Sequence, residues 1–234
     1  MKTVVVAGAT GAVGIEAARL VAARPELRGI ALARRDAPLP PGIAPRRFAY
    51  DDPAAYDALF AEVPADVLLI ALGTTIAKAG SAEAFNRVDR DYPLALIEAL
   101  RRARPDAVVG LASAAGTAGG GNLYYRAKAA VEAGLGASGL RHAILRPSLL
   151  IAERAELRPG ERLALALLAP PYLAFARHLA PRSRAVWRYA PVAAGRVAAA
   201  LLHHTLDDPP PAAGRIVEGL ELHAAPAPVG RRAA

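Results

Sequence analysis

Cysteine is absent from the chain of 234 residues. This absence excludes a disulfide scaffold, zinc held by cysteine, an iron–sulfur cluster and catalysis by a thiol. Because a chain without disulfides suits a reducing compartment, we expect a cytoplasmic protein. The segment 1–14 makes a poor secretory signal, since it carries one lysine and its apolar run stops at a glycine-rich turn.

Long hydrophobic runs and basic blocks are also missing. No apolar run reaches the roughly 20 residues that span a bilayer, and the longest candidate, 163–176, contains Pro170 and Pro171. The formal net charge is +8, but the basic residues are scattered singly and in pairs, without interleaved aromatic residues. This pattern favours a small-molecule substrate as the partner, and no nucleic acid.

What is present is an alternation of apolar strand-like segments with helical segments through the first 150 residues. This alternation predicts a parallel sheet covered on both faces, and right-handed crossovers make it a doubly wound α/β fold of the Rossmann type. We assign residues 1–150 to this core. The expected strands are 2–7, 29–33, 46–50, 66–72, 107–112 and 141–146, and the expected helices are 12–23, 53–62, 84–104 and 123–137.

The pattern changes after Pro147. Segment 150–190 consists of helical pieces interrupted by prolines, 193–205 predicts a helix and 214–222 a last strand. We expect 151–223 to form a small C-terminal subdomain on the substrate side of the core, and 224–234 to be a disordered tail.

The apolar stretch 163–176 has three interpretations. It forms a lid or pocket wall for an apolar substrate, it packs on the sheet, or it rests on an anionic membrane together with nearby arginines. The membrane surface is the least favoured of these. Trp187 and Tyr189 also suit a contact between two copies of the chain, so a homodimer stays open.

A glycine-rich turn links the first expected strand to the first helix. Gly8 permits the tight turn, Gly11 lets the backbone approach a pyrophosphate, and Gly14 allows close packing of helix on strand. The free N–H groups at the start of the helix attract phosphates. The turn therefore predicts a dinucleotide site made by Gly8, Thr10, Gly11, Ala12, Val13 and Gly14.

The choice of cofactor depends on the residues after the second and third strands. Arg34 and Arg35 stand where an NAD-dependent enzyme usually carries an acid, and guanidinium groups match a 2′-phosphate. We therefore predict NADPH (NADP) over NADH, the alternative being a solvated arginine pair. Asp51 and Asp52 stand where an acid bonds the adenine, although Asp52 equally suits a cap for the helix that follows.

Three residues indicate the chemistry. Ser113 ends the fifth strand, and Tyr124 and Lys128 are four residues apart on one helical face. Transfer of a hydride to a carbonyl needs a proton donor, and a nearby ammonium lowers the pKa of a tyrosine from about 10. We predict that Tyr124 is the acid/base group, that Lys128 lowers its pKa, and that Ser113 orients the substrate oxygen.

Alternatives to this site remain open. Tyr125 is an alternative acid/base group, since it lies three residues from Lys128. Tyr124 and Lys128 could also be an exposed polar pair on the helix without a catalytic role. Lysine occurs only at Lys2, Lys78 and Lys128 among 29 basic residues, which fits a fixed role for Lys128. His203 and His204 are adjacent and face different directions on a helix, so we predict no metal site.

Two further segments carry a resemblance to a known family. The strings LGTTIAKAG at 72–80 and RVDRDY at 87–92 resemble the Tat-interacting-protein-type oxidoreductases. Over about residues 2–220 the chain is similar to atypical or extended members of the short-chain dehydrogenase/reductase superfamily, in its epimerase-like and NmrA-like NAD(P)-binding group. The resemblance implies that Ser113, Tyr124 and Lys128 occupy the catalytic positions. It also implies that the cofactor is lined by Ala71, Leu72, Gly73, Thr74, Tyr124, Lys128, Pro147 and Leu149.

These observations predict an NADPH-dependent oxidoreductase that acts on a small, apolar carbonyl or alcohol. Two alternatives are an NADPH-binding redox sensor without turnover and an epimerase-like enzyme that recycles its cofactor. The C-terminal region is shorter than that of sugar-nucleotide epimerases, which disfavours a large nucleotide-sugar substrate.

Overall fold

A seven-stranded, fully parallel sheet forms the centre of the computed structural model, which describes residues 1–119, 121–151 and 159–224. The strand order is β3-β2-β1-β4-β5-β6-β9. It reverses between β1 and β4, so the carboxyl ends of these two neighbours form the switch point where such sheets bind ligands. The strands are β1 (Lys2–Ala7), β2 (Leu27–Ala33), β3 (Ala44–Arg47), β4 (Val67–Ile70), β5 (Val108–Ala112), β6 (Arg141–Arg146) and β9 (Arg215–Glu218).

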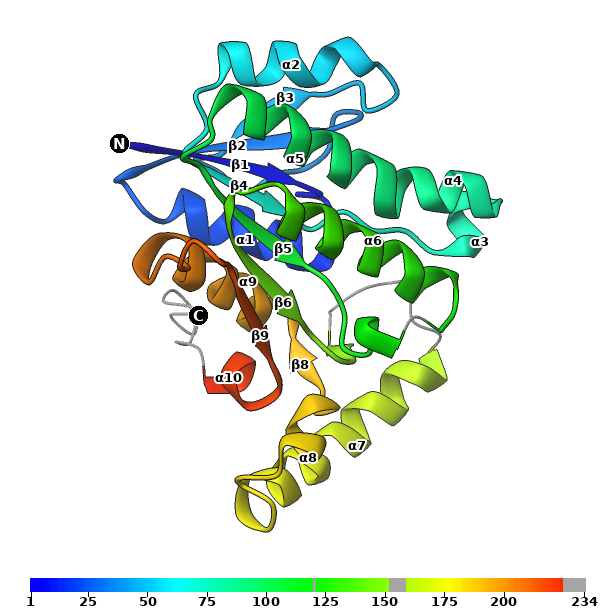
Figure 1. Ribbon diagram of the computed structural model, residues 1–234. Coiled ribbons are helices and arrows are strands. Elements are labelled where there is room, and N and C mark those ends of the chain that lie inside the picture. Colours follow the sequence, from blue (N-terminus) through cyan, green and yellow to red (C-terminus); the bar gives the residue numbers. More distant parts are fainter. Residues whose placement is uncertain (120, 152–158, 225–234) are drawn as a thin grey trace.

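Helices cover both faces of the sheet (Figure 1). One layer contains α1 (Ala12–Ala22) and α9 (Ala194–Leu202), and the other contains α2 (Pro53–Glu62), α5 (Tyr92–Ala103) and α6 (Leu123–Ala137). Successive strand side chains alternate between the two layers, so Val4 and Val6 of β1 face α1 while Val5 faces α5. A strand buried on both sides is apolar throughout, which is why the sequence pattern predicted this fold, and the doubly wound parallel architecture is confirmed.

Several expected elements end differently, among them the strands expected at 46–50 and 66–72, which end at Arg47 and Ile70. The helix expected at 84–104 is divided into α4 (Ala82–Asn86), a π-helical turn (Arg87–Asp91) and α5, and the helix expected at 193–205 also ends in a π-helical turn (His203–Asp207). The last strand stops at Glu218, because Gly219 adopts a positive φ of 56° and starts α10 (Gly219–Ala224). A single-sequence pattern does not distinguish a π turn from an α-helix, since both place apolar residues three to five apart.

The C-terminal part divides between the core and a projection. Helix α9 packs on α1 and strand β9 extends the sheet, whereas α7 (Pro159–His178) and α8 (Arg184–Arg188) lie apart from the sheet (Figure 1). Strands β7 (Leu150–Ile151) and β8 (Val192–Ala193) pair in parallel and bracket this projection. Of the expected tail, only Ala224 lies within the described residues.

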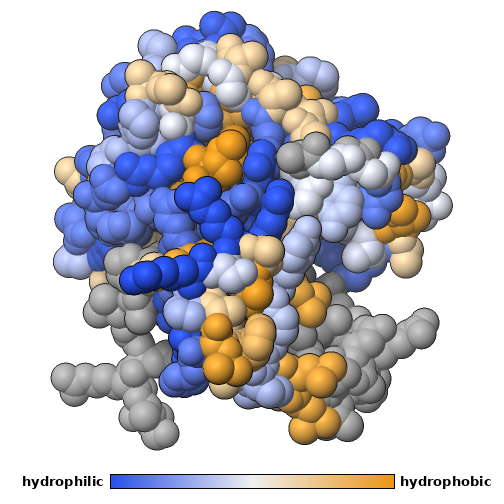
Figure 2. Space-filling model, turned by 60° about the horizontal axis from the view of Figure 1, so that its bottom comes forward, coloured by the Kyte–Doolittle hydropathy of each residue, from blue (hydrophilic) through white to orange (hydrophobic). Residues whose placement is uncertain are grey.

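Helix α7 corrects the expected break at Pro170 and Pro171. Both prolines lie inside this helix. The φ angle that proline imposes is compatible with a helix, although each proline lacks the N–H that would bond the carbonyl four residues before it. Leu167, Leu168 and Phe175 are exposed on this helix, and Figure 2, which brings this end forward, shows hydrophobic side chains gathered there. Within the described ranges no helix has the length and hydropathy to cross a bilayer.

Substitution of Gly14 tests the packing of α1 on the first turn. A Cβ at this position would lie 2.0 Å from the carbonyl oxygen of Gly8. Because this oxygen belongs to the backbone, it cannot easily move aside. We expect Gly14→Ala to lower the free energy of unfolding by about 3 kcal/mol, measured by urea denaturation. Gly136→Ala is the matched control, since nothing lies within 4 Å of a Cβ there, and it should stabilise α6 by about 0.5 kcal/mol. Equal effects of the two substitutions would contradict this packing.

Candidate active site

The turn between β1 and α1 forms one wall of the site. Gly8 has a φ of 89°, and a Cβ there would lie 2.5 Å from the carbonyl oxygen of Ala71, the first residue after β4. The Gly11 N–H donates to the Gly8 carbonyl over 2.8 Å and caps α1 without a side-chain bond. The first turn of α1 contains no acidic residue, so its free N–H groups offer an anion site. Gly14 packs this helix on the turn and lines neither pocket at the carboxyl edge of the strands.

Two adjoining pockets form a groove along the carboxyl edge of the strands. Their volumes are about 220 Å³ and 700 Å³, and they share Gly11, Lys78 and the segment 71–74. We call them the inner and the outer pocket. Residues of the inner pocket include Ala12, Val13, Ser113, Tyr124, Lys128, Pro147 and Leu150. Residues of the outer pocket include Gly8, Thr10, Arg34, Arg35, Asp51, Arg87 and Tyr92.

The outer pocket carries a concentration of positive charge. Arg34 and Arg35 are exposed there, and neither forms a hydrogen bond or ion pair with another residue in the part of the chain that is described. Asp51 lines this pocket and accepts a 2.6 Å hydrogen bond from the Tyr92 hydroxyl. Asp52 lies outside it and accepts from the Ala54 N–H over 3.0 Å as the N-cap of α2, which is the alternative that the sequence left open.

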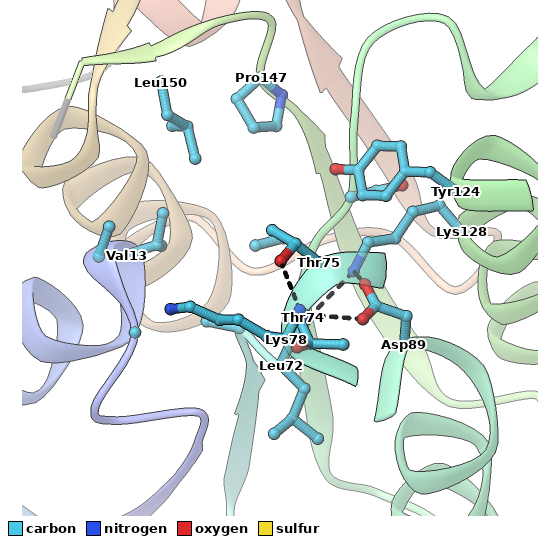
Figure 3. Close-up of a pocket in the computed structure, with 16 residues that line it drawn as sticks. Val13, Leu72, Thr74, Thr75, Lys78, Asp89, Tyr124, Lys128, Pro147 and Leu150 are labelled. Carbon is cyan, nitrogen blue, oxygen red and sulfur yellow. Dashed lines mark hydrogen bonds and ion pairs between the residues drawn. The ribbon is translucent and has the colours of Figure 1, made fainter. Parts of the chain in front are cut away.

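The inner pocket distinguishes between the two tyrosines. Tyr124 lines it, and Figure 3 shows its hydroxyl pointing into the pocket. Tyr125 does not line the pocket and packs against Gly116, where a Cβ would lie 3.4 Å from its ring. On the opposite side of the pocket, Leu150 replaces the expected Leu149, which is more than half exposed. Alternate residues of an extended segment face opposite sides, so only one of these two leucines can point inward.

Lys128 forms an ion pair that the sequence reading did not include. Its ammonium lies 3.1 Å from Asp89 Oδ1 and donates to the Leu72 carbonyl over 3.1 Å (Figure 3). Asp89 also accepts a 2.7 Å hydrogen bond from the Thr74 N–H. Asp89 is fully buried and the Lys128 side chain is 6% exposed. The pair lines the inner pocket and joins α6 to the segment after β4.

The pKa of Tyr124 moves in the direction opposite to the expectation. Burial, the charge of Asp89 and the neighbouring Tyr125 raise the pKa of Tyr124 to about 12. The ammonium of Lys128 lies 5.8 Å from the centre of the Tyr124 ring, but Asp89 balances its charge. Burial also raises the pKa of Asp89, against the opposing effect of Lys128. The phenol is therefore protonated at neutral pH in this state.

Ser113 is held by a second buried ion pair. Its hydroxyl bonds the carboxylate of Glu132, which Arg146 binds through two nitrogens, the shorter contact being 2.6 Å. Tyr124, Lys128 and Glu132 are spaced by four residues, so α6 presents all three on one face. The repeat of four could have pointed to Glu132, and Asp89 lies in the string RVDRDY that carries the family resemblance, whereas no pattern in the sequence linked Arg146 to the site.

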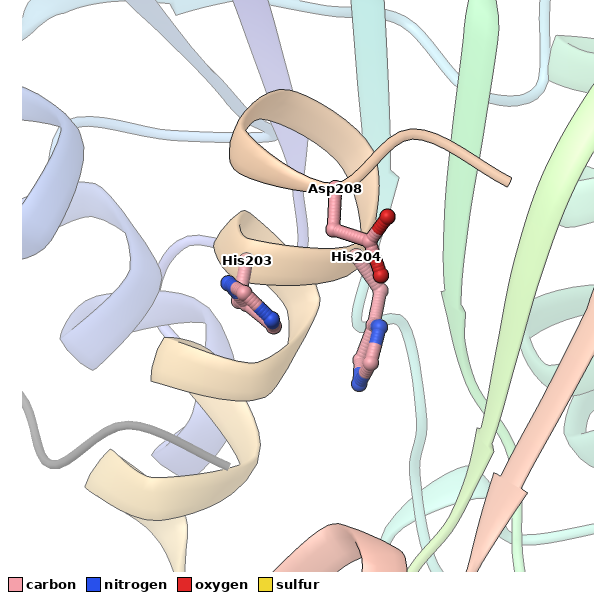
Figure 4. A group of neighbouring side chains, drawn as sticks. All are labelled: His203, His204 and Asp208. Carbon is pink, nitrogen blue, oxygen red and sulfur yellow. The ribbon is translucent and has the colours of Figure 1, made fainter. Parts of the chain in front are cut away.

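A histidine cluster lies away from the groove. His203, His204 and Asp208 bring ligand-type atoms within 4.8 Å of one another (Figure 4). The centres of the two rings are 4.9 Å apart, so the expectation that the two side chains diverge is wrong. Arg215 donates to His204 Nδ1 over 2.9 Å and pairs with Asp208. Its guanidinium already supplies the cation between these groups, and we assign no metal to them.

Comparison with known proteins identifies the family. Residues 4–168 match the NAD dependent epimerase/dehydratase family, and the chain belongs to it. The mitochondrial protein fmp52 of Emericella nidulans is 32% identical over 171 residues, which cover 70% of this chain and 73% of that protein. Protein HTATIP2 of Rattus norvegicus is 39% identical over 100 residues, 42% of this chain and 41% of that protein. The resemblance to Tat-interacting-protein-type oxidoreductases is thereby confirmed.

Solved structures share the fold at low sequence identity. The UDP-Glc/GlcNAc 4-epimerase of Campylobacter jejuni has a TM-score of 0.69 at 12% identity, covering 96% of this chain and 82% of its own. MoeE5 in complex with UDP-glucose and NAD has a TM-score of 0.65 at 16% identity, covering 93% and 75%. These similarities support the doubly wound α/β fold of this chain.

The relatives also correct the expected location. The fmp52 proteins of Emericella nidulans and Candida albicans are both named as mitochondrial, which contradicts the cytoplasmic location predicted from the absence of cysteine. That absence excludes a disulfide scaffold, but it does not distinguish one compartment from another.

A double-mutant cycle tests the pair between Asp89 and Lys128. We expect Asp89→Asn and Lys128→Met each to lower the free energy of unfolding by about 3 kcal/mol, because each leaves a buried charge without its partner. The double variant should lose about 2 kcal/mol less than the sum of the two, measured by urea denaturation. The control cycle uses the exposed pair Arg46–Glu62, where the coupling should stay below about 1 kcal/mol. Additive effects at Asp89 and Lys128 would refute the pair.

Proposed function

We propose that the protein is an NADPH-dependent oxidoreductase that transfers a hydride between the nicotinamide and a small carbonyl or alcohol substrate. One observation carries the proposal: Tyr124, Lys128 and Ser113 all line the inner pocket of the groove that begins at the glycine turn, and the Tyr124 hydroxyl points into it. This combination provides an anion site, a nucleotide-sized groove and a proton donor in a single continuous space.

The residues of the groove fit a nicotinamide dinucleotide. The close approach of Gly8 to Ala71 leaves a cradle that a Cβ would fill, and the free N–H groups of α1 face it. Val13, Pro147 and Leu150 supply apolar walls at the inner end, while Arg34 and Arg35 supply guanidinium groups at the outer end. When bound, the cofactor supplies or accepts the hydride, and a 2′-phosphate is the group that the two arginines match.

The side chains of the inner pocket divide the proton chemistry between them. Tyr124, protonated at neutral pH, donates its proton to the oxygen of a carbonyl substrate as that oxygen becomes negative. Lys128 is held by Asp89 and the Leu72 carbonyl, with its ammonium 5.8 Å from the centre of the Tyr124 ring. The apolar walls limit the access of water to the reacting atoms.

A redox sensor without turnover is the second candidate function. The high pKa of Tyr124 favours it, because a phenol with a pKa of about 12 is a slow acid at neutral pH. A binding protein of this kind would hold the cofactor and transfer no hydride to any member of a broad carbonyl panel. An enzyme that recycles its cofactor would instead convert a substrate without net consumption of NADPH.

Replacement of Tyr124 tests the catalytic role. Tyr124→Phe removes the proton donor and keeps the ring, so we expect turnover to fall by about a thousandfold while NADPH binds as before. The measurement combines NADPH consumption at 340 nm over a carbonyl panel with a fluorescence titration of the cofactor. Tyr125→Phe is the control, since this neighbour lies outside the pocket and its replacement should leave turnover within about twofold. Retained turnover in Tyr124→Phe would remove the proposed role.

Replacement of Arg34 and Arg35 tests the choice of cofactor. The double variant Arg34→Ala with Arg35→Ala should bind NADPH about tenfold to a hundredfold more weakly, because charge-assisted hydrogen bonds to the 2′-phosphate are lost. Binding of NADH, which lacks that phosphate, should change by less than about threefold. Arg28→Ala, an exposed arginine at the other end of β2, is the control. A parallel loss for both nucleotides would reject the preference for NADPH.

A further inference from the structure

We propose that Glu132 is a positioning residue that turns the Ser113 hydroxyl proton away from the substrate. The inner pocket then recognises a hydroxyl group, and it binds the alcohol form of the substrate more tightly than the carbonyl form. The proposal rests on the proposed function, and it names the chemical form of the substrate that this chain selects.

The hydrogen bond between Ser113 and Glu132 has a defined direction. A carboxylate paired with a guanidinium can only accept, so the proton in this bond belongs to Ser113. Arg146 Nε lies 3.1 Å from Glu132 Oε1, and Arg146 Nη2 lies 2.6 Å from Oε2. Ser113 is 5% exposed and Glu132 is 8% exposed, so water competes little for either group.

The neighbouring hydroxyl does not change this direction. Thr117 Oγ1 lies 3.5 Å from Ser113 Oγ, but its own proton goes to the Ala114 carbonyl. Both protons are directed at protein acceptors, so Ser113, which lines the pocket with Tyr124, has no proton left for a ligand and can only accept from one.

The consequence is a complementary pair of groups in one pocket. Tyr124 offers a proton, and Ser113 offers an acceptor. An alcohol oxygen can accept from the first and donate to the second, whereas a carbonyl oxygen has no proton and leaves the buried Ser113 oxygen unmatched. The sequence reading, in which Ser113 simply orients the substrate oxygen, did not specify which of these two roles it takes.

Glu132→Gln reverses the direction of the hydrogen bond with little change of shape. The Arg146 guanidinium requires an acceptor, so the glutamine oxygen faces Arg146 and its amide N–H group faces Ser113. Ser113 Oγ then accepts from the glutamine, and its proton turns into the pocket. The variant should therefore favour a carbonyl ligand over an alcohol ligand.

The experiment compares two probes under conditions in which neither reacts. Cyclohexanol is titrated into the NADPH-loaded protein and cyclohexanone into the NADP-loaded protein, and both dissociation constants are measured by ligand-observed nuclear magnetic resonance. The ratio of the two constants is compared between the wild type and Glu132→Gln, so the difference between the cofactor forms cancels. We expect this ratio to shift by about tenfold or more toward the ketone in the variant.

Ser113→Ala supplies the control for a merely structural role. In a chain that lacks the Ser113 hydroxyl, Glu132→Gln should leave the ratio unchanged, and thermal unfolding checks that each variant is folded. The proposal is overturned if Glu132→Gln leaves the ratio unchanged or if neither probe binds. It is also overturned if the shift persists in a chain that carries Ser113→Ala. Because no turnover is needed, these outcomes are distinct from a failure of the proposed function, which the Tyr124→Phe kinetics report.

Discussion

The close contact between Gly8 and Ala71 is the constraint on which the rest of the site depends. The backbone after β1 and the backbone after β4 can approach each other only because position 8 carries no Cβ and adopts a positive φ. The contact lies at the switch point of the strand order, so it brings the start of α1 and the segment 71–74 to opposite sides of one groove.

Helix α6 supplies the chemistry of the inner pocket through one face. Its three side chains at intervals of four residues are a phenol, an ammonium and a carboxylate, and the two charged ones are each paired with a buried partner from another element. Asp89 comes from the π-helical turn before α5, and Arg146 ends β6. Buried pairs of this kind contribute little net stability, but they fix where each charge lies and which hydrogen bonds remain for a ligand.

The two ion pairs also act on Tyr124 and Ser113, the two hydroxyl groups that line the inner pocket. Burial is the largest cause of the raised pKa of Tyr124, and the charge of Asp89, the ion-pair partner of Lys128, raises it further. A serine at a sheet edge donates to a substrate only if its proton is available, and Glu132 takes it. In both cases a residue outside the predicted site acts on a predicted one: Asp89 on Tyr124, and Glu132 on Ser113.

The sequence by itself determined the layers of the fold and the location of the groove. Both follow from local patterns, which can be recognised in the sequence alone. These patterns are the apolar strands that alternate with helices, the three glycines after the first strand, and the spacing of Ser113, Tyr124 and Lys128. Only the tertiary structure decided that Tyr124 rather than Tyr125 faces the pocket, that Leu150 replaces Leu149, and that Asp89, Glu132 and Arg146 belong to the site. The physical reason is that burial and pairing between distant segments set the direction of a hydrogen bond and the sign of a pKa shift, and neither quantity is encoded in the spacing of residues along the chain.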